Sequence, residues 1–132
     1  MLDTNSWIEY FKNRNGVADH VDALPRTQLC ASEITVAELI YGAYNSKNFE
    51  KHYREAMWLK NSIEIYPISD ALDDYGDIRF ATKRKGNPIG QFDPLIGATA
   101  RHYGLTVVTD NLKDFSPMPG VKIENWVERP KE

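Results

Sequence analysis

The chain has 132 residues, of which 42% are hydrophobic and 27% charged, values close to the average of globular domains. This length fits a single domain with a core, and no repeat, low-complexity run or linker divides residues 1–132. The net charge of −3 argues against a protein held to nucleic acid by its overall field, so any such role needs a local basic patch or a metal ion.

Cysteine, histidine and the N-terminus exclude further classes. The single cysteine, Cys30, excludes an internal disulfide and a multi-cysteine zinc site, and we interpret it as a buried thiol in a reducing compartment. The three histidines have no metal-ligand spacing. No signal pattern and no apolar run of membrane-spanning length is present. We therefore expect a cytoplasmic protein without a membrane partner.

The first half of the chain predicts helices around one strand. Residues 1–3 are too short to assign alone, and residues 6–16 predict a helix capped by Ser6, with Glu9 completing a capping box. A short helix follows in residues 16–24, and residues 28–32 predict a strand. Residues 34–46 give the clearest helix, with an apolar stripe that includes Tyr44, and residues 48–62 give another amphipathic helix.

The second half alternates strand and helix. Residues 63–69 and 105–110 predict strands, and residues 121–127 predict a final edge strand. Helices are expected from Ser69 or Asp70 to about Lys85 and in residues 91–104. Single strands separated by helices predict an α/β fold with a mainly parallel sheet. Such sheets carry active groups at the carboxyl ends of their strands, where Asp3 and Asp110 lie.

Two more acids lie on helices, and each has an ordinary structural explanation. Glu38 lies opposite the apolar stripe of its helix, which predicts a solvated side chain. Asp93 precedes Pro94 and would serve as an N-cap. If that helix instead begins near Gln91, the Asp93 side chain is free to point elsewhere.

Taken in order, the segments "MLDTN", "ASEITVAELIYGA", "KGNPIGQFDPLIGATA", "LTVVTDNLKDF" and "PGVKIENW" resemble the PIN-domain nucleases. The similarity is closest to the VapC toxins of bacterial toxin–antitoxin modules and runs nearly from end to end. Members usually have a few more residues before the LDTN segment, so the natural start would lie upstream or the first strand would be short. The resemblance implies a three-layer α/β sandwich and an endoribonuclease that requires Mg²⁺ or Mn²⁺.

The resemblance also implies residue roles. The matched catalytic acids are Asp3, Glu38 and Asp93, with Asp3 and Asp93 as metal ligands. The fourth acidic position is open between Asp110, Asn111 and Asp114. Thr4, Asn5 and Thr109 match small polar positions that support the carboxylates.

RNA-binding residues are less specific in the sequence. The run Lys83, Arg84 and Lys85 leads toward Asp93 and is the best basic candidate, although charged runs are usually solvated helix faces. Aromatic residues that would stack on bases are Tyr41, Tyr44 and Phe92, with core packing favoured for Tyr44.

Two other functions compete. A haloacid-dehalogenase-type phosphatase also places an Asp after its first strand, but it needs a second Asp where this chain has Asn5. A PIN-like module that binds RNA or protein without catalysis is the alternative from another class. Metal-dependent RNA cleavage separates it from the nuclease.

The resemblance further implies partners: an RNA substrate, with transfer RNA as a family-level possibility, a VapB-like antitoxin and a homodimer. Trp7, Ile8 and Phe11 would offer a groove to the antitoxin. Residues 57–59 are three consecutive large apolar residues, which cannot all face one core, so we expect at least one to lie in a subunit interface. The alternative is that Trp58 lies against a neighbouring loop of its own chain.

Overall fold

The computed structural model describes residues 1–84 and 89–129 of the chain. The N-terminal elements are α1 (Thr4–Phe11), α2 (Val17–Asp22), η1 (Arg26–Gln28), β1 (Cys30–Ser32), α3 (Glu33–Tyr44) and α4 (Phe49–Ser62). The C-terminal elements are β2 (Glu64–Tyr66), η2 (Ser69–Ala71), α5 (Leu72–Arg84), α6 (Asp93–His102), β3 (Thr106–Val108), α7 (Leu112–Phe115) and β4 (Lys122–Glu124). Within these described residues, each helix is too short or too polar to cross a membrane.

Residues 1–3 join two parallel strand pairs into one layer. Strand β1 pairs with β2, and β3 pairs with β4. Leu2 forms a parallel bridge with Val108 of β3, and its amide donates to the carbonyl of Cys30 in β1 over 3.3 Å. The order across the layer is therefore β4, β3, residues 1–3, β1, β2. The predicted parallel sheet and its final edge strand, β4, are confirmed.

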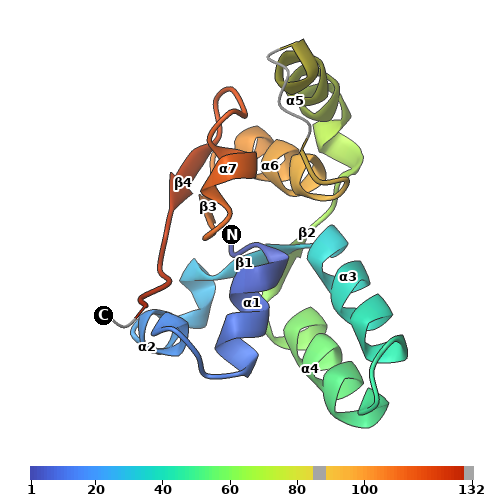
Figure 1. The fold of residues 1–132 in the computed structure, drawn as a ribbon, viewed down its shortest axis with the longest axis vertical. Helices are drawn as coiled ribbons and strands as arrows, with labels where there is room; N and C mark the ends of the chain where they lie inside the picture. The colour runs from blue at the N-terminus through green and yellow to red at the C-terminus, as the bar shows by residue number, and fades with distance from the viewer. Residues whose placement is uncertain (85–88, 130–132) are drawn as a thin grey trace.

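Alternation along the strands gives the sheet two buried faces. Met1, Cys30 and Val107 belong to one apolar cluster, which also takes residues from α5, α6 and α7. The next residues along, Leu2, Ala31 and Val108, belong to a second cluster with residues from α1 to α4. Figure 1 shows the same division, with α5 to α7 on one side of the N-terminus and α1 to α4 on the other. The predicted three-layer sandwich is confirmed.

The start of the first helix differs from the prediction. Asp3, rather than Ser6, is the N-cap of α1: its backbone is extended (ψ 174°) and its Oδ1 accepts the amide of Ser6 over 2.9 Å. An aspartate that leaves a strand in extended conformation is well suited to cap a helix that begins at the next residue. The turn from strand to helix therefore places the Asp3 carboxylate at the edge of the sheet.

Trp58 packs against its own chain, as the alternative to a subunit interface predicted. The Trp58 ring stacks on Tyr10 with centroids 6.0 Å apart and meets the edge of Phe11 at 5.9 Å, while the guanidinium of Arg26 lies 5.5 Å above it. Leu59 is buried in the same apolar cluster. Side chains of α1 and η1 thus cover the apolar run within one chain.

Two other aromatic residues also differ from expectation. Tyr44 was expected in the core, but 71% of its surface is exposed, because it ends α3 and touches Phe49 only edge-on, with centroids 4.9 Å apart. Trp7 was expected in a partner groove, but it is fully buried in the core of the α1 to α4 face. Of the three residues expected to form the groove, Ile8 and Phe11 line a surface hollow, and Trp7 serves the core.

Candidate active site

Asp3 lies at the carboxyl end of the central segment of the sheet. Its amide donates to the carbonyl of Val108 over 3.0 Å, which fixes the backbone beside β3. Its Oδ1 accepts the Ser6 amide at 2.9 Å and its Oδ2 accepts the Thr109 hydroxyl at 2.6 Å, and only 2% of the residue is exposed. Burial raises the pKa of Asp3, and the hydrogen bonds from Thr109 and Ser6 counteract part of that rise.

Glu38 faces the site from α3. The Thr4 hydroxyl donates to Glu38 Oε1 over 2.6 Å and lies 3.1 Å from the Thr35 hydroxyl. Since Thr4 has one hydroxyl proton and the shorter contact takes it, Thr35 is the donor in the longer contact. Burial raises the pKa of Glu38, and the negative charge of Asp3 adds to that rise. The expectation of a solvated Glu38 is therefore wrong.

Asp93 opens α6 without acting as its cap. The N-cap position is Phe92, so the Asp93 carboxylate is not used as an N-cap acceptor. Asn111 Nδ2 donates to Asp93 Oδ2 over 2.8 Å. Burial, a hydrogen bond with Asp114 and the charges of Asp3, Asp114 and Glu38 raise the pKa of Asp93 to about 7. Four carboxyl groups from distant parts of the chain therefore share one electrostatic environment.

A chain of hydrogen bonds holds Asp3 and Asp93 in fixed relation. The Thr109 hydroxyl donates to Asp3 and accepts the amide of Asn111 at 2.9 Å, while the Asn111 side chain donates to Asp93. Asn111 thus positions Asp93. The residues that follow β3 connect the sheet-edge acid to the helix-end acid.

Of the two remaining acids, Asp114 lies with Asp93 and Asp110 does not. Asp114 Oδ2 accepts the amide of Gly90 at 3.1 Å. Asp110 instead receives both guanidinium nitrogens of Arg129, at 3.1 and 2.6 Å, and the Asn125 side chain at 3.0 Å. The Arg129 guanidinium holds the pKa of Asp110 below its usual range.

The remaining predicted residues lie farther out. Asn5 is exposed and lines a hollow of about 360 Å³ with Asp110 and Arg129. Lys83 is exposed in the last turn of α5, which Figure 1 shows at the end of the molecule away from the N-terminus. Arg84 ends α5, and Lys85 lies outside the described residues.

Sequence reasoning missed three groups that contact the acids: the Ser6 amide, Gly90 and Arg129. A Cβ at Gly90 would lie 3.4 Å from Asp114 Oδ2 and 3.6 Å from Asp93 Oδ2, which is ordinary van der Waals contact, so this backbone position lies directly beside both acids. The glycine before "QFDP" was the available signal for this close approach. Nothing in the sequence pattern pairs Arg129 with Asp110.

The donor chemistry fits a divalent cation at Asp93 and Asp114. Within residues 1–84 and 89–129, no group of three or more His, Cys, Asp or Glu side chains is arranged to hold one metal ion. Mg²⁺, however, commonly takes one or two carboxylates and keeps several waters. The negative charge of Asp114 raises the pKa of Asp93, so the two carboxylates repel each other unless a proton or a cation lies between them. A cation in place of that proton satisfies the same pair.

The raised pKa of Asp93 predicts a pH-dependent stability. A carboxyl group whose pKa rises on folding, here from 3.8 to about 7, stabilises the fold at low pH and loses that contribution as the pH rises through 7. Without divalent metal, we expect Asp93→Asn to have a higher Tm than the wild type at pH 8, by roughly 2–8 °C. This gain should shrink steadily between pH 7 and pH 4.

Thermal unfolding in buffers without metal, from pH 4 to pH 8, measures this difference. Asp73→Asn, which changes an exposed carboxylate of α5, is the control and should show no such trend. A stability gain in Asp93→Asn that is the same at every pH would contradict the assigned pKa.

Comparisons with known proteins point to one family. Residues 1–119 match the PIN domain family. The chain is 37% identical to a tRNA(fMet)-specific endonuclease VapC of Salmonella typhimurium over 96% of both chains, and 34% identical to ribonuclease VapC1 of Haemophilus influenzae over 97% of this chain and 98% of that protein.

Solved structures agree with the sequence comparisons. A chain of DNA-bound VapBC from Salmonella typhimurium matches with a TM-score of 0.85 and 36% identity over 96% of both chains. A chain of VapBC2 from Rickettsia felis, bound to a promoter DNA fragment, matches with the same TM-score and 30% identity, over 96% of this chain and 97% of that one.

Proposed function

Because this chain belongs to the PIN-domain family and, within it, to the VapC ribonucleases, we propose that it is a divalent-metal-dependent endoribonuclease that hydrolyses RNA phosphodiester bonds. The observation that supports the proposal is the shared environment of Asp3, Glu38, Asp93 and Asp114. Clustered carboxylates repel one another, so such a cluster is costly without a cation or proton among them. The PIN fold leaves no support for the phosphatase alternative.

Each acid has a distinct part in this proposal. Asp93 and Asp114 would hold Mg²⁺ or Mn²⁺, which when bound neutralises the phosphate and stabilises the leaving oxygen. Asp3, which the family resemblance implies as a metal ligand beside Asp93, stays a proposed ligand; Thr109 and Ser6 fix it, and it supplies negative charge beside Asp93. Asn111 keeps Asp93 oriented.

Glu38 is the proposed proton acceptor. Thr4 binds its Oε1, so its Oε2 is the oxygen that would accept a proton from the attacking water. The raised pKa of Glu38 suits a general base, because a base is most effective when its pKa approaches the working pH.

The substrate we propose to test first is transfer RNA, because the Salmonella typhimurium relative is named a tRNA(fMet)-specific endonuclease. Purified protein should cleave a defined species in total cellular RNA when Mg²⁺ is present. Cleavage should stop in EDTA and return when Mg²⁺ is added in excess. Sequencing of the cut ends identifies the species.

Two outcomes would contradict the proposal. Cleavage that persists in EDTA would show that the acids work without a metal. A folded protein that binds RNA but cleaves none of it, with Mg²⁺ or with Mn²⁺, would support the non-catalytic alternative.

We further propose that an antitoxin neutralises the chain, since similar solved chains occur in VapBC complexes. A hollow of about 220 Å³ between α1, α3 and α4 is lined by Ile8, Phe11 and Leu39 and reaches Glu38. Apolar walls of this kind suit a partner helix or strand. An Arg or Lys from that partner would pair with the acids in place of the metal. A homodimer also stays a proposal.

A further inference from the structure

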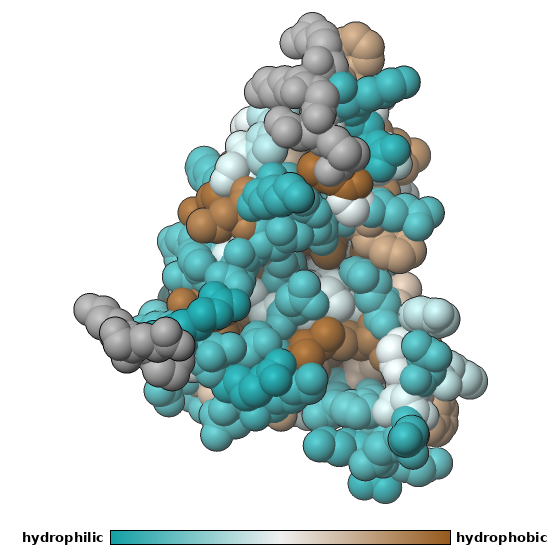
Figure 2. Space-filling model, in the orientation of Figure 1, coloured by the Kyte–Doolittle hydropathy of each residue, from teal (hydrophilic) through white to brown (hydrophobic). Residues whose placement is uncertain are grey.

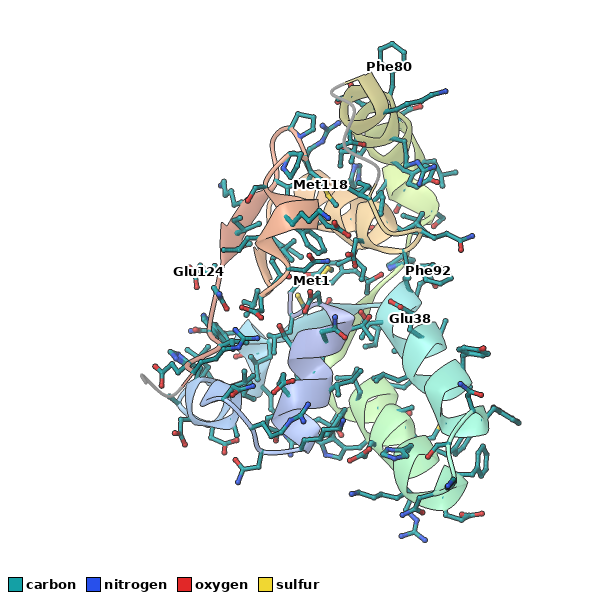
Figure 3. All side chains as sticks on the ribbon, viewed as in Figure 1. Met1, Glu38, Phe80, Phe92, Met118 and Glu124 are labelled. Atoms are coloured by element: carbon teal, nitrogen blue, oxygen red, sulfur yellow. The ribbon has the colours of Figure 1, made fainter. Side chains whose placement is uncertain are left out.

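A second, apolar hollow borders the acids. It also reaches Glu38 but is lined by other residues than the hollow between α1, α3 and α4. Its volume is about 350 Å³, and its lining is Ile34, Ala37, Glu38, Tyr41 and Phe92. Among the residues that the structure describes, Glu38 is the one charged member of this lining, and the other four supply apolar or aromatic surface. Figure 3 shows Phe92 next to Glu38, at the junction between α3 and the start of α6.

Two aromatic side chains of this hollow are unusually exposed. Tyr41 is 71% and Phe92 43% exposed. Large aromatic rings left in water next to a carboxylate cluster are unfavourable unless something covers them. Figure 2 shows one face of the molecule as largely hydrophilic, with a few separate hydrophobic areas.

The two rings are also fixed in position relative to the acids. Phe92 immediately precedes Asp93, and Tyr41 lies one helical turn after Glu38 on α3. Each ring therefore shares a rigid element with a carboxylate of the site. A ligand group bound by the acids and a ligand group lying on the rings are therefore held at a fixed separation.

We propose that this hollow receives a nucleobase next to the scissile phosphate, stacked on Tyr41 and Phe92. The inference rests on the proposed ribonuclease function. A phosphate held at the acids brings its neighbouring base to the adjoining surface, and an unstacked base is recognised by aromatic side chains. The volume lies at the small end of the range for small-molecule clefts, which suits a single flat ring system.

Charge favours a base over a second copy of this chain. A copy seated here would bury the Glu38 carboxylate against apolar and aromatic side chains, with no cation in the described lining to pair with it. A nucleobase is neutral, and the phosphate attached to it is the group that the metal site is proposed to take. The base therefore covers the rings without adding an unpaired charge.

The test compares Tyr41→Ala and Phe92→Ala with the matched control Tyr44→Ala. Tyr44 lies on the same helix and is equally exposed at 71%, but it does not line the hollow. Tyr41→Phe keeps the ring and should behave as wild type. All four variants change exposed rings, at positions 41, 44 and 92, so folding should be retained, and circular dichroism checks this.

Binding is measured in an Asp93→Asn background, so that the RNA stays intact. The probes are a fluorescein-labelled single-stranded 12-mer RNA of mixed sequence and a set of the same 12-mer with one abasic ribonucleotide at each position. We expect Tyr41→Ala and Phe92→Ala each to weaken binding by about 5- to 100-fold, the range for one lost base–aromatic stack. Tyr44→Ala should change it by less than about twofold.

The abasic set identifies the stacked nucleotide. With the Asp93→Asn protein, one of the abasic RNAs should bind as much more weakly as the intact RNA does after Tyr41→Ala. With that same abasic RNA, adding Tyr41→Ala should cause no further loss of binding. Additive losses at every position would overturn the stacking. Equal binding by Tyr41→Ala, Phe92→Ala and Tyr44→Ala would overturn it as well.

Failure of this inference is distinguishable from failure of the proposed function. If the wild type cleaves RNA and both alanine variants cleave it with unchanged KM and kcat, the ribonuclease stands and the base site is wrong. If the wild type cleaves no RNA, the binding arm still decides the base site. Sedimentation in which Tyr41→Ala converts a dimer to a monomer would assign the hollow to a second copy instead.

Discussion

Replacement of Asp93 by asparagine is expected to lower RNA cleavage by roughly 10²–10³-fold, as removal of one preorganised charged or polar group does in other active sites. The Asp93 carboxyl is the one that burial, Asp114, Asp3 and Glu38 together drive to a pKa of about 7. Asparagine has the same shape and keeps an oxygen to accept from Asn111, but it carries no negative charge for the cation. The loss should therefore appear in kcat/KM with the fold intact.

The measurement is single-turnover cleavage of the RNA species identified in total cellular RNA, at saturating Mg²⁺. Asp73→Asn serves as the control, because it removes one negative charge from an exposed position on α5. Asp93→Asn with more than a tenth of wild-type activity, while Asp73→Asn is unchanged, would remove Asp93 from the catalytic set.

The sequence predicted the sheet edge well because its determinants are local. Short β-branched runs such as residues 106–108 and 63–66 are bounded by helices, and parallel strands align their carboxyl ends. Asp3 and the residues after β3 were placed together on that basis. The N-cap was misplaced because the capping-box pattern at Ser6 and Glu9 gave no weight to Asp3, whose strand is only completed by distant residues.

Helical periodicity predicted the wrong burial for side chains whose surroundings are set by other elements or by the end of the helix. Glu38 was predicted to be solvated because its own helix buries the opposite stripe, yet Thr4 of α1 and the acids beyond it surround its carboxylate. Tyr44 was placed in the core by the same stripe and is exposed, because α3 ends there. A single-helix pattern contains no information on what lies across the sheet edge, and here only the family resemblance supplied it.

The choice among Asp110, Asn111 and Asp114 was open in the sequence because the three lie within five residues and all follow β3. Their directions depend on α7 and on the C-terminal segment. Asp114 sits in the short helix α7 and turns toward Gly90 and Asp93. Arg129, nineteen residues beyond Asp110, draws Asp110 away.

Asp114→Asn is therefore expected to lower kcat/KM by about 10- to 100-fold and to raise the Mg²⁺ concentration needed for half-maximal cleavage, as changes beside a metal ligand do. Asp110→Asn is the matched variant, with the same chemical change four residues earlier. It breaks only an exposed pair with Arg129, which solvent weakens, and should change kcat/KM by no more than about fivefold.

The Mg²⁺ dependence separates a metal ligand from a structural residue. If Asp114→Asn lowers activity without changing the Mg²⁺ requirement, Asp114 supports Gly90 and does not bind the ion. If Asp110→Asn is the variant with the larger loss, Asp110 supplies the fourth charge and must leave Arg129 to do so, in which case Arg129→Ala should increase cleavage. The structure predicts the opposite order, because Asp114 lies beside Asp93 and raises its pKa, whereas Asp110 is already paired with Arg129.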